Sequence, residues 1–84
     1  MAHSIVRLRV AQPATYRIKI QGALDESWGD YFGGLQINQI PLADQASLTV
    51  LTGQVLDQIM LLSILNRLCD LGFPIRSVEW LVEQ

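Results

Sequence analysis

The strongest local signal in the chain is one long apolar pattern with helical spacing, at residues 55–71. Thr52, just before it, is a residue type that caps helix N-termini, and Asp57 near its start suits the positive end of a helix dipole. Gly72 follows at the position where a left-handed residue ends many helices, and Pro74 prevents continuation. These signals predict one helix with two defined ends.

Alternation of apolar and polar residues on both sides of this helix predicts strands with one buried face. The strands are expected at residues 5–10, 16–21, 35–40, 47–52 and 75–82. The predicted fold is therefore α+β: a single small domain over residues 1–84, with an antiparallel sheet of four to five strands and one long helix packed on it. The order is β-β-(loop)-β-β-α-β. Residues 1–14 are either a strand of this sheet or an N-terminal arm.

The loop in this order carries the spacing Leu24, Trp28 and Phe32, which one or two helical turns would place on one face. The glycines in the same segment favour a compact loop instead. We expect Trp28 to plug one end of the core. Gly33 and Gly34 are expected to allow a tight path into the next strand.

The apolar part of the predicted helix is too wide for one sheet. On a helical wheel it fills an arc of roughly 200°, whereas a helix on a sheet needs little more than about 100°. Half of the residues are hydrophobic and 17% are charged, against roughly 25% in typical domains. The surplus is covered either by the loop at residues 24–32 or by a second subunit.

We favour the second subunit and expect a homodimer. The candidate interface is Met60, Leu61, Ile64, Leu65 and Leu68. The polar stripe of the helix is then expected to be its only face in water, and it consists of Ser63, Asn66, Arg67 and Asp70.

The residues that could carry chemistry do not form a recognisable site. Asp25, Glu26 and Asp30 flank Trp28, but their spacing does not match a calcium loop and no histidine is nearby. The single histidine lies near the N-terminus. Cys69 lies on the apolar arc and is expected to be a small core residue. We therefore expect no catalytic residues, no metal site and no cofactor, and the third hypothesis, an enzyme using the loop carboxylates, has the least support.

Two further surfaces remain as alternatives. A pocket between the loop and the helix start, formed by Trp28, Gly33, Gly34, Asp57 and Gln58, would make the protein a small-ligand-binding regulatory domain. A basic sheet face, formed by Arg7, Arg9, Arg17 and Lys19, is either an ordinary solvated face or a docking surface for an acidic partner or a phosphate. The net charge of −2 and the lack of aromatic residues on that face argue against nucleic acid.

The chain shows no pattern typical of membrane insertion or export. No stretch approaches the roughly 18 continuous apolar residues of a spanning helix, and the N-terminus lacks the layout of a signal peptide. The single cysteine fits a reducing compartment. We expect a cytoplasmic protein that does not bind membranes.

Several short motifs together resemble a family of small, stand-alone bacterial proteins of unassigned function. They are Leu24-Asp25 with Trp28, the run from Phe32 through Gly33-Gly34 to Leu35, the Leu51-Thr52-Gly53 stretch with Asp57-Gln58, and Asp70-Leu71-Gly72. In that family the helix continues with small residues and a histidine followed by glycine. Here Leu62 and Ser63 stand at the matching positions, so a role based on that histidine does not carry over. The resemblance covers residues 16–82 and implies a bacterial cytoplasmic protein, with no chemistry attached.

Overall fold

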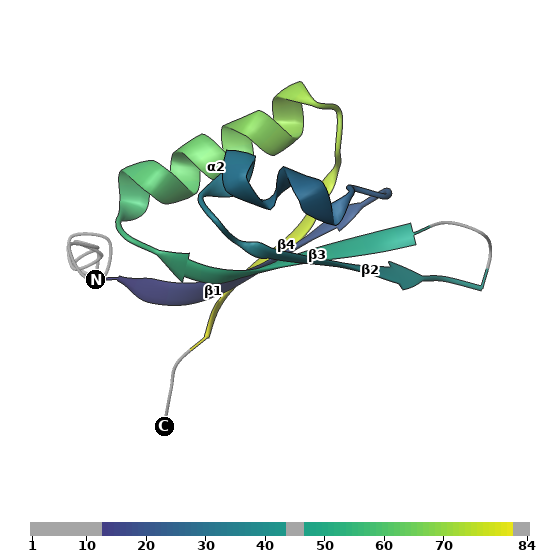
Figure 1. Ribbon diagram of the computed structural model, residues 1–84, viewed down its shortest axis with the longest axis horizontal. Coiled ribbons are helices and arrows are strands. Elements are labelled where there is room, and N and C mark those ends of the chain that lie inside the picture. Colours follow the sequence, from purple (N-terminus) through teal and green to yellow (C-terminus); the bar gives the residue numbers. More distant parts are fainter. Residues whose placement is uncertain (1–12, 44–46, 82–84) are drawn as a thin grey trace, which may run out of the picture.

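A four-stranded antiparallel sheet forms the frame of the molecule, in the strand order β2-β3-β1-β4. The structure, a computed structural model, describes residues 13–43 and 47–81. Its elements are β1 (Ala14–Gln21), the 3₁₀ helix η1 (Glu26–Phe32), β2 (Gln36–Pro41), β3 (Ser47–Val55), α2 (Gln58–Asp70) and β4 (Ile75–Leu81). Both helices lie on the same face of the sheet (Figure 1). The α+β class and the antiparallel sheet with one packed helix are confirmed, whereas the strand expected at residues 5–10 lies outside the described residues.

β1 is a central strand and shows why the alternating pattern was informative. It pairs antiparallel with β3 on one side and with β4 on the other. Ile18 and Ile20 point into the core and are fully buried, while Arg17 and Lys19 point to the opposite face. A strand side chain alternates between the two faces, so one period-two pattern supplies both the core and the open face of the sheet.

The helix starts later than its sequence pattern indicates. Residues up to Val55 continue β3, where Val55 pairs with Ala14 and Gly53 with Tyr16. The expected cap, Thr52, is therefore a strand residue, and the helix begins after Asp57, whose carboxylate accepts a hydrogen bond from Met60 N at 2.8 Å. Pairing with β1 competes with helix formation here, and a glycine and β-branched residues tip that competition towards the strand.

The C-terminal end of α2 agrees with the sequence-based expectation. Gly72 has a φ of 88°, which is the left-handed conformation that glycine adopts without strain. The N–H of Phe73 donates to the carbonyl of Leu68 at 3.0 Å, and the N–H of Gly72 donates to Cys69 at 2.9 Å. These two bonds form a Schellman motif, which satisfies carbonyls that the helix leaves free.

The segment after β1 forms a 3₁₀ helix where a loop was favoured. Its carboxylate cap is Asp25, which accepts a hydrogen bond from Ser27 N at 3.2 Å. The expected core plug, Trp28, is 40% exposed, whereas Phe32 is fully buried. The reason is geometric: a 3₁₀ helix has three residues per turn, so residues four apart do not share a face. Phe32 therefore takes the core position.

A buried threonine fixes where this segment leaves the sheet. Thr49 Oγ1 accepts a hydrogen bond from Leu24 N at 3.1 Å and donates one to Gly22 O at 2.6 Å. Gln39 Nε2 donates to Leu24 O at 3.0 Å. β3 and β2 thus hold the backbone at residues 22–24, and Leu24 is directed into the core.

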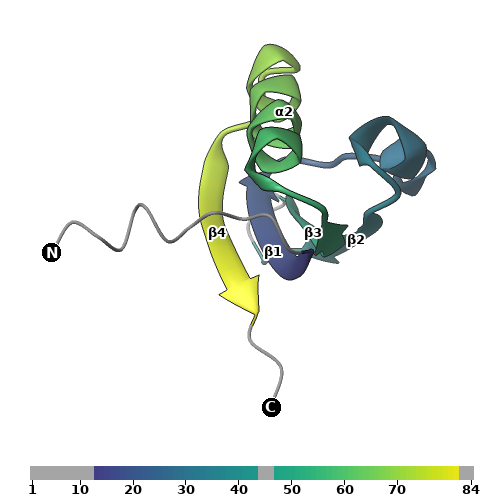
Figure 2. The same cartoon turned by 90° about the vertical axis from the view of Figure 1, so that its left-hand side faces the viewer.

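The helical layer covers the sheet unevenly. η1 packs over β2, and α2 lies over the middle of the sheet, as seen end-on in Figure 2. The core consists of Ile18, Ile20, Leu24, Phe32, Leu35, Ile37, Leu51, Val55, Ile64 and Leu68. Among the described residues of β4 none is fully buried. The β4 edge is therefore the least covered part of this sheet face.

Candidate interaction surfaces

The residues expected to form an interface on the helix mostly belong to the core of this chain. Ile64 and Leu68 are fully buried beneath α2. The other three expected interface residues are half-buried and pack against the core, namely Met60, Leu61 and Leu65. Ile64 and Leu68 are therefore not available to a second copy without opening the domain.

The outer face of α2 is less polar than expected. Ile59 is 77% exposed and Leu62 is 51% exposed, and Cys69 is exposed as well. The expectation that the polar stripe would be the only face in water is therefore wrong, as is the expectation that Cys69 lies in the core. Shortening the helix to Gln58–Asp70 does not change this result, because Ile59 and Leu62 lie within it.

The most exposed large aromatic side chain belongs to the edge strand. Trp80 is 63% exposed and Val78 is 41% exposed. Both lie on the helix-covered side of the sheet, since Val78 pairs with Ile18 and Trp80 with Tyr16. Leu62 belongs to the flank of α2 turned away from η1, as its wheel position opposite Met60 requires. We call Leu62, Val78 and Trp80 the apolar edge.

The opposite face of the sheet carries partly neutralised charge. Arg17 Nε donates to Glu79 Oε1 at 3.0 Å across the β1–β4 pair. Lys19 occupies the same face two residues further, and Arg76 donates to Gln21 Oε1 at 3.3 Å. Arg17 and Lys19 thus share one face as expected, while Arg7 and Arg9 lie outside the described residues. The ion pair removes one of the basic charges that an acidic partner would meet.

An aromatic cluster joins η1 to α2. The rings of Trp28 and Tyr31 meet edge-to-face with centroids 5.4 Å apart. The Arg67 guanidinium stands 4.7 Å from the centroid of the Tyr31 ring and donates to Tyr31 O at 2.6 Å. Both aromatic rings remain over a third exposed. Trp, Tyr and Arg are the residue types most enriched at energetically important interface positions.

The acidic residues of η1 are used locally. The Ser27 hydroxyl donates to the Asp25 carboxylate and, together with the Ser27 backbone N–H, holds the pKa of Asp25 below its ordinary value. Asp25 therefore acts as a helix cap. Within the described residues there is no group of three or more His, Cys, Asp or Glu placed to hold a metal ion.

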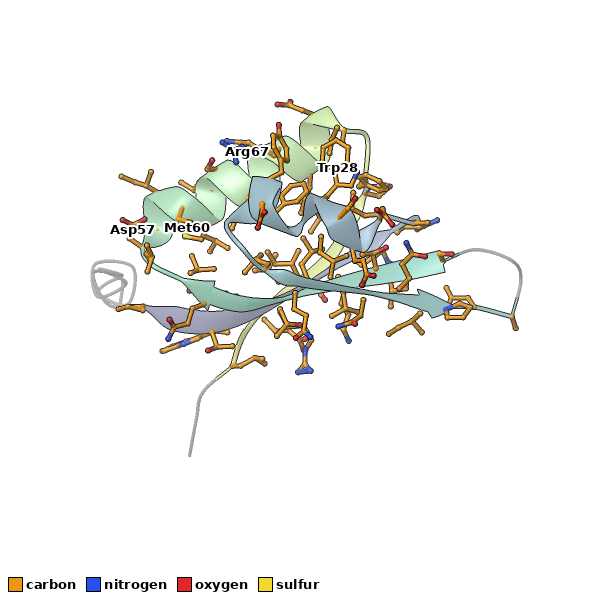
Figure 3. All side chains as sticks on the ribbon, viewed as in Figure 1. Trp28, Asp57, Met60 and Arg67 are labelled. Atoms are coloured by element: carbon orange, nitrogen blue, oxygen red, sulfur yellow. The ribbon has the colours of Figure 1, made fainter. Side chains whose placement is uncertain are left out.

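The residues of the expected ligand pocket are not brought together. Figure 3 shows Trp28 well away from Asp57 and Met60, which lie at the start of α2. The Met60 methyl group stands over Gly33 and fills the space that a side chain there would need. Asp57 is engaged in capping. An open depression of about 250 Å³ instead lies on the other side of η1, and it is lined by Asp25, Glu26, Ile37, Asn38 and Gln39.

The comparisons with known proteins identify a family without assigning an activity. Residues 15–79 match the model described as Domain of unknown function (DUF8691), so the chain belongs to that family. No curated protein and no solved structure is significantly similar to it. The match covers every described strand and both helices, except for the first residue of β1 and the last two of β4. Among the described residues, no helix is long and apolar enough to cross a membrane.

Proposed function

We propose that this protein is a non-enzymatic, homo-oligomeric interaction module that works by presenting helix and sheet surfaces to a partner. The observation that carries the proposal is the unfinished cover of the sheet. Trp80, Val78 and Leu62 stay largely in solvent although the domain has already formed its core. Large exposed apolar patches on soluble domains mark sites of association.

The charge content supports the same conclusion. Only 17% of the residues are charged, which is low for a small domain that must stay dispersed in water. Burying exposed apolar side chains against a second copy stabilises the chain by roughly 25 cal/mol per Å² removed from water. The proposal sets this assembly in the bacterial cytoplasm, where the single cysteine stays reduced.

Sedimentation velocity over a concentration series tests the proposal. We expect a dimer at micromolar concentrations, with dissociation only on strong dilution. A monomer throughout that range would overturn it. Because ionic contacts play a small part, raising the salt concentration is expected to preserve or strengthen the dimer.

A further inference from the structure

We infer that two copies of this chain associate through β4, with the two edge strands antiparallel about a twofold axis and the two sheets joined into one. The inference rests on the proposed homo-oligomeric function and names the surface that performs it. Among the described residues β4 pairs only with β1, so its other side offers free backbone N–H and C=O groups. Such an edge is a template for another strand.

The two edges of the sheet differ in a way that selects β4. Edge strand β2 ends in Pro41, has polar Gln36, Asn38 and Gln39, and lies next to η1. Proline and polar or covered edges are the means by which proteins prevent strand addition. β4 has no proline or lysine, and its one irregularity is a register shift near its start.

A second copy fits this edge better than an open series of copies. Pairing β4 with β2 of the next copy would leave free edges at both ends and would continue into a filament. Pairing β4 with β4 uses the same surface twice and closes the assembly at two. The protected β2 edge is what such a closed dimer requires.

Charge and polar groups favour one register of this pair. In a register centred on Val78, Ser77 lies opposite Glu79 of the partner subunit and no like charges face each other. A register centred on Glu79 would place two carboxylates opposite each other, which is destabilising. Ser77 Oγ is buried with no hydrogen-bond partner among the described residues. Rotation about its Cα–Cβ bond turns this hydroxyl towards the edge, where the partner's Glu79 would accept its proton.

The available area is of the right order. A stable interface buries about 1,000 Å² or more in total, or about 500 Å² per copy. Each copy offers the apolar edge together with one side of a seven-residue strand. An aromatic side chain alone buries on the order of 150–250 Å² when fully covered. With both helices on the same side of the joined sheet, Trp80 would be enclosed between the two copies.

Cross-linking tests the register directly. In a Cys69→Ser background, Val78→Cys would meet its own counterpart at a Cα separation of about 4.5–5.5 Å, within the range of a disulfide. We expect this variant to form a covalent dimer on mild oxidation. The matched control is Ile40→Cys, an exposed apolar residue of the other edge strand, which is expected to remain reduced.

A second pair of variants tests the edge without a cross-link. Trp80→Lys places a charge in the apolar edge and is expected to weaken the dimer by roughly 30-fold or more, as loss of a central aromatic anchor does. Ile40→Lys is expected to leave the dimer unchanged. Circular dichroism on both variants establishes that the fold is kept.

The outcomes separate this inference from the proposed function. A dimer that persists in Trp80→Lys, or one in which Ile40→Cys cross-links and Val78→Cys does not, would overturn the β4 interface and leave homo-oligomerisation standing. A wild-type monomer would overturn both. Loss of the dimer in Trp80→Lys alone, with the Val78→Cys cross-link, supports both.

Discussion

Thr49 is a small residue with a large positional role. It lies in the middle of β3 with no exposed surface, yet its hydroxyl bonds two backbone groups of the segment that leads into η1. A buried polar group is tolerated when its hydrogen bonds are satisfied, and here both capacities of the hydroxyl are used. Thr49 therefore couples the position of η1 to the centre of the sheet.

Replacing Thr49 with valine is expected to destabilise the protein by about 1–3 kcal/mol. Valine keeps the shape but leaves Leu24 N and Gly22 O without their partner, and unsatisfied buried groups cost about this much. Urea unfolding measures the change. Thr49→Ser keeps the hydroxyl and is the control; a valine variant as stable as the serine variant would contradict the assignment.

Ser27 sets the proton affinity of Asp25. Because the Ser27 hydroxyl contributes most to the lowered pKa of Asp25, Ser27→Ala is expected to raise this pKa towards its ordinary value. The pKa is lowered in the folded state, so the stabilising effect of this cap is present above the unfolded-state pKa and is lost as the pH falls through the folded-state value. An NMR titration of the Asp25 carboxyl carbon measures the shift, and an unchanged pKa would show that the hydroxyl has no influence.

At the scale of elements, the sequence determines types better than boundaries. All four described strands and the helix occur where alternation and helical spacing predict them, and Gly72 ends the helix as expected. The start of α2 was misassigned because Thr52 and Asp57 are both good capping residues. Only long-range pairing of β3 with β1, which a local pattern does not contain, decides between them.

The N-cap of α2 can be tested by substitution. Asp57→Ala is expected to cost about 1 kcal/mol, because Met60 N loses its acceptor. Asp57→Asn caps almost equally well and is expected to retain most of the stability. Thermal unfolding of the three proteins measures the difference. Equal destabilisation by both substitutions would indicate that the charge, and not the cap, is what matters.

At the scale of the whole molecule, the notable property is an asymmetric cover. The wide apolar arc on α2 correctly indicated surplus apolar surface, but the candidate interface chosen from it included Ile64 and Leu68, which the fold buries. The exposed residues are those of the apolar edge. Their exposure depends on β4 being outermost in the sheet, and the order β2-β3-β1-β4 could not be derived from alternation alone.

A dimer of folded chains makes the midpoint of thermal unfolding depend on concentration. Association binds only the folded state, so dilution is expected to lower the midpoint. Scanning calorimetry from micromolar to near-millimolar protein measures this. Trp80→Lys is expected to unfold at a lower temperature that does not vary with concentration, and a concentration-independent midpoint in the wild type would contradict a dimer in this range.

The central position of β1 also has a consequence for how the chain folds. Every strand partner of β1 lies in the second half of the sequence, from Leu48 to Leu81. The first strand therefore gains its neighbours only after long loops close, and the relative contact order of such a sheet is high. Refolding is expected to be slower than for helical proteins of similar size. During that interval the alternating surface of β1 is unpaired, so dilute protein is expected to refold with higher yield than concentrated protein.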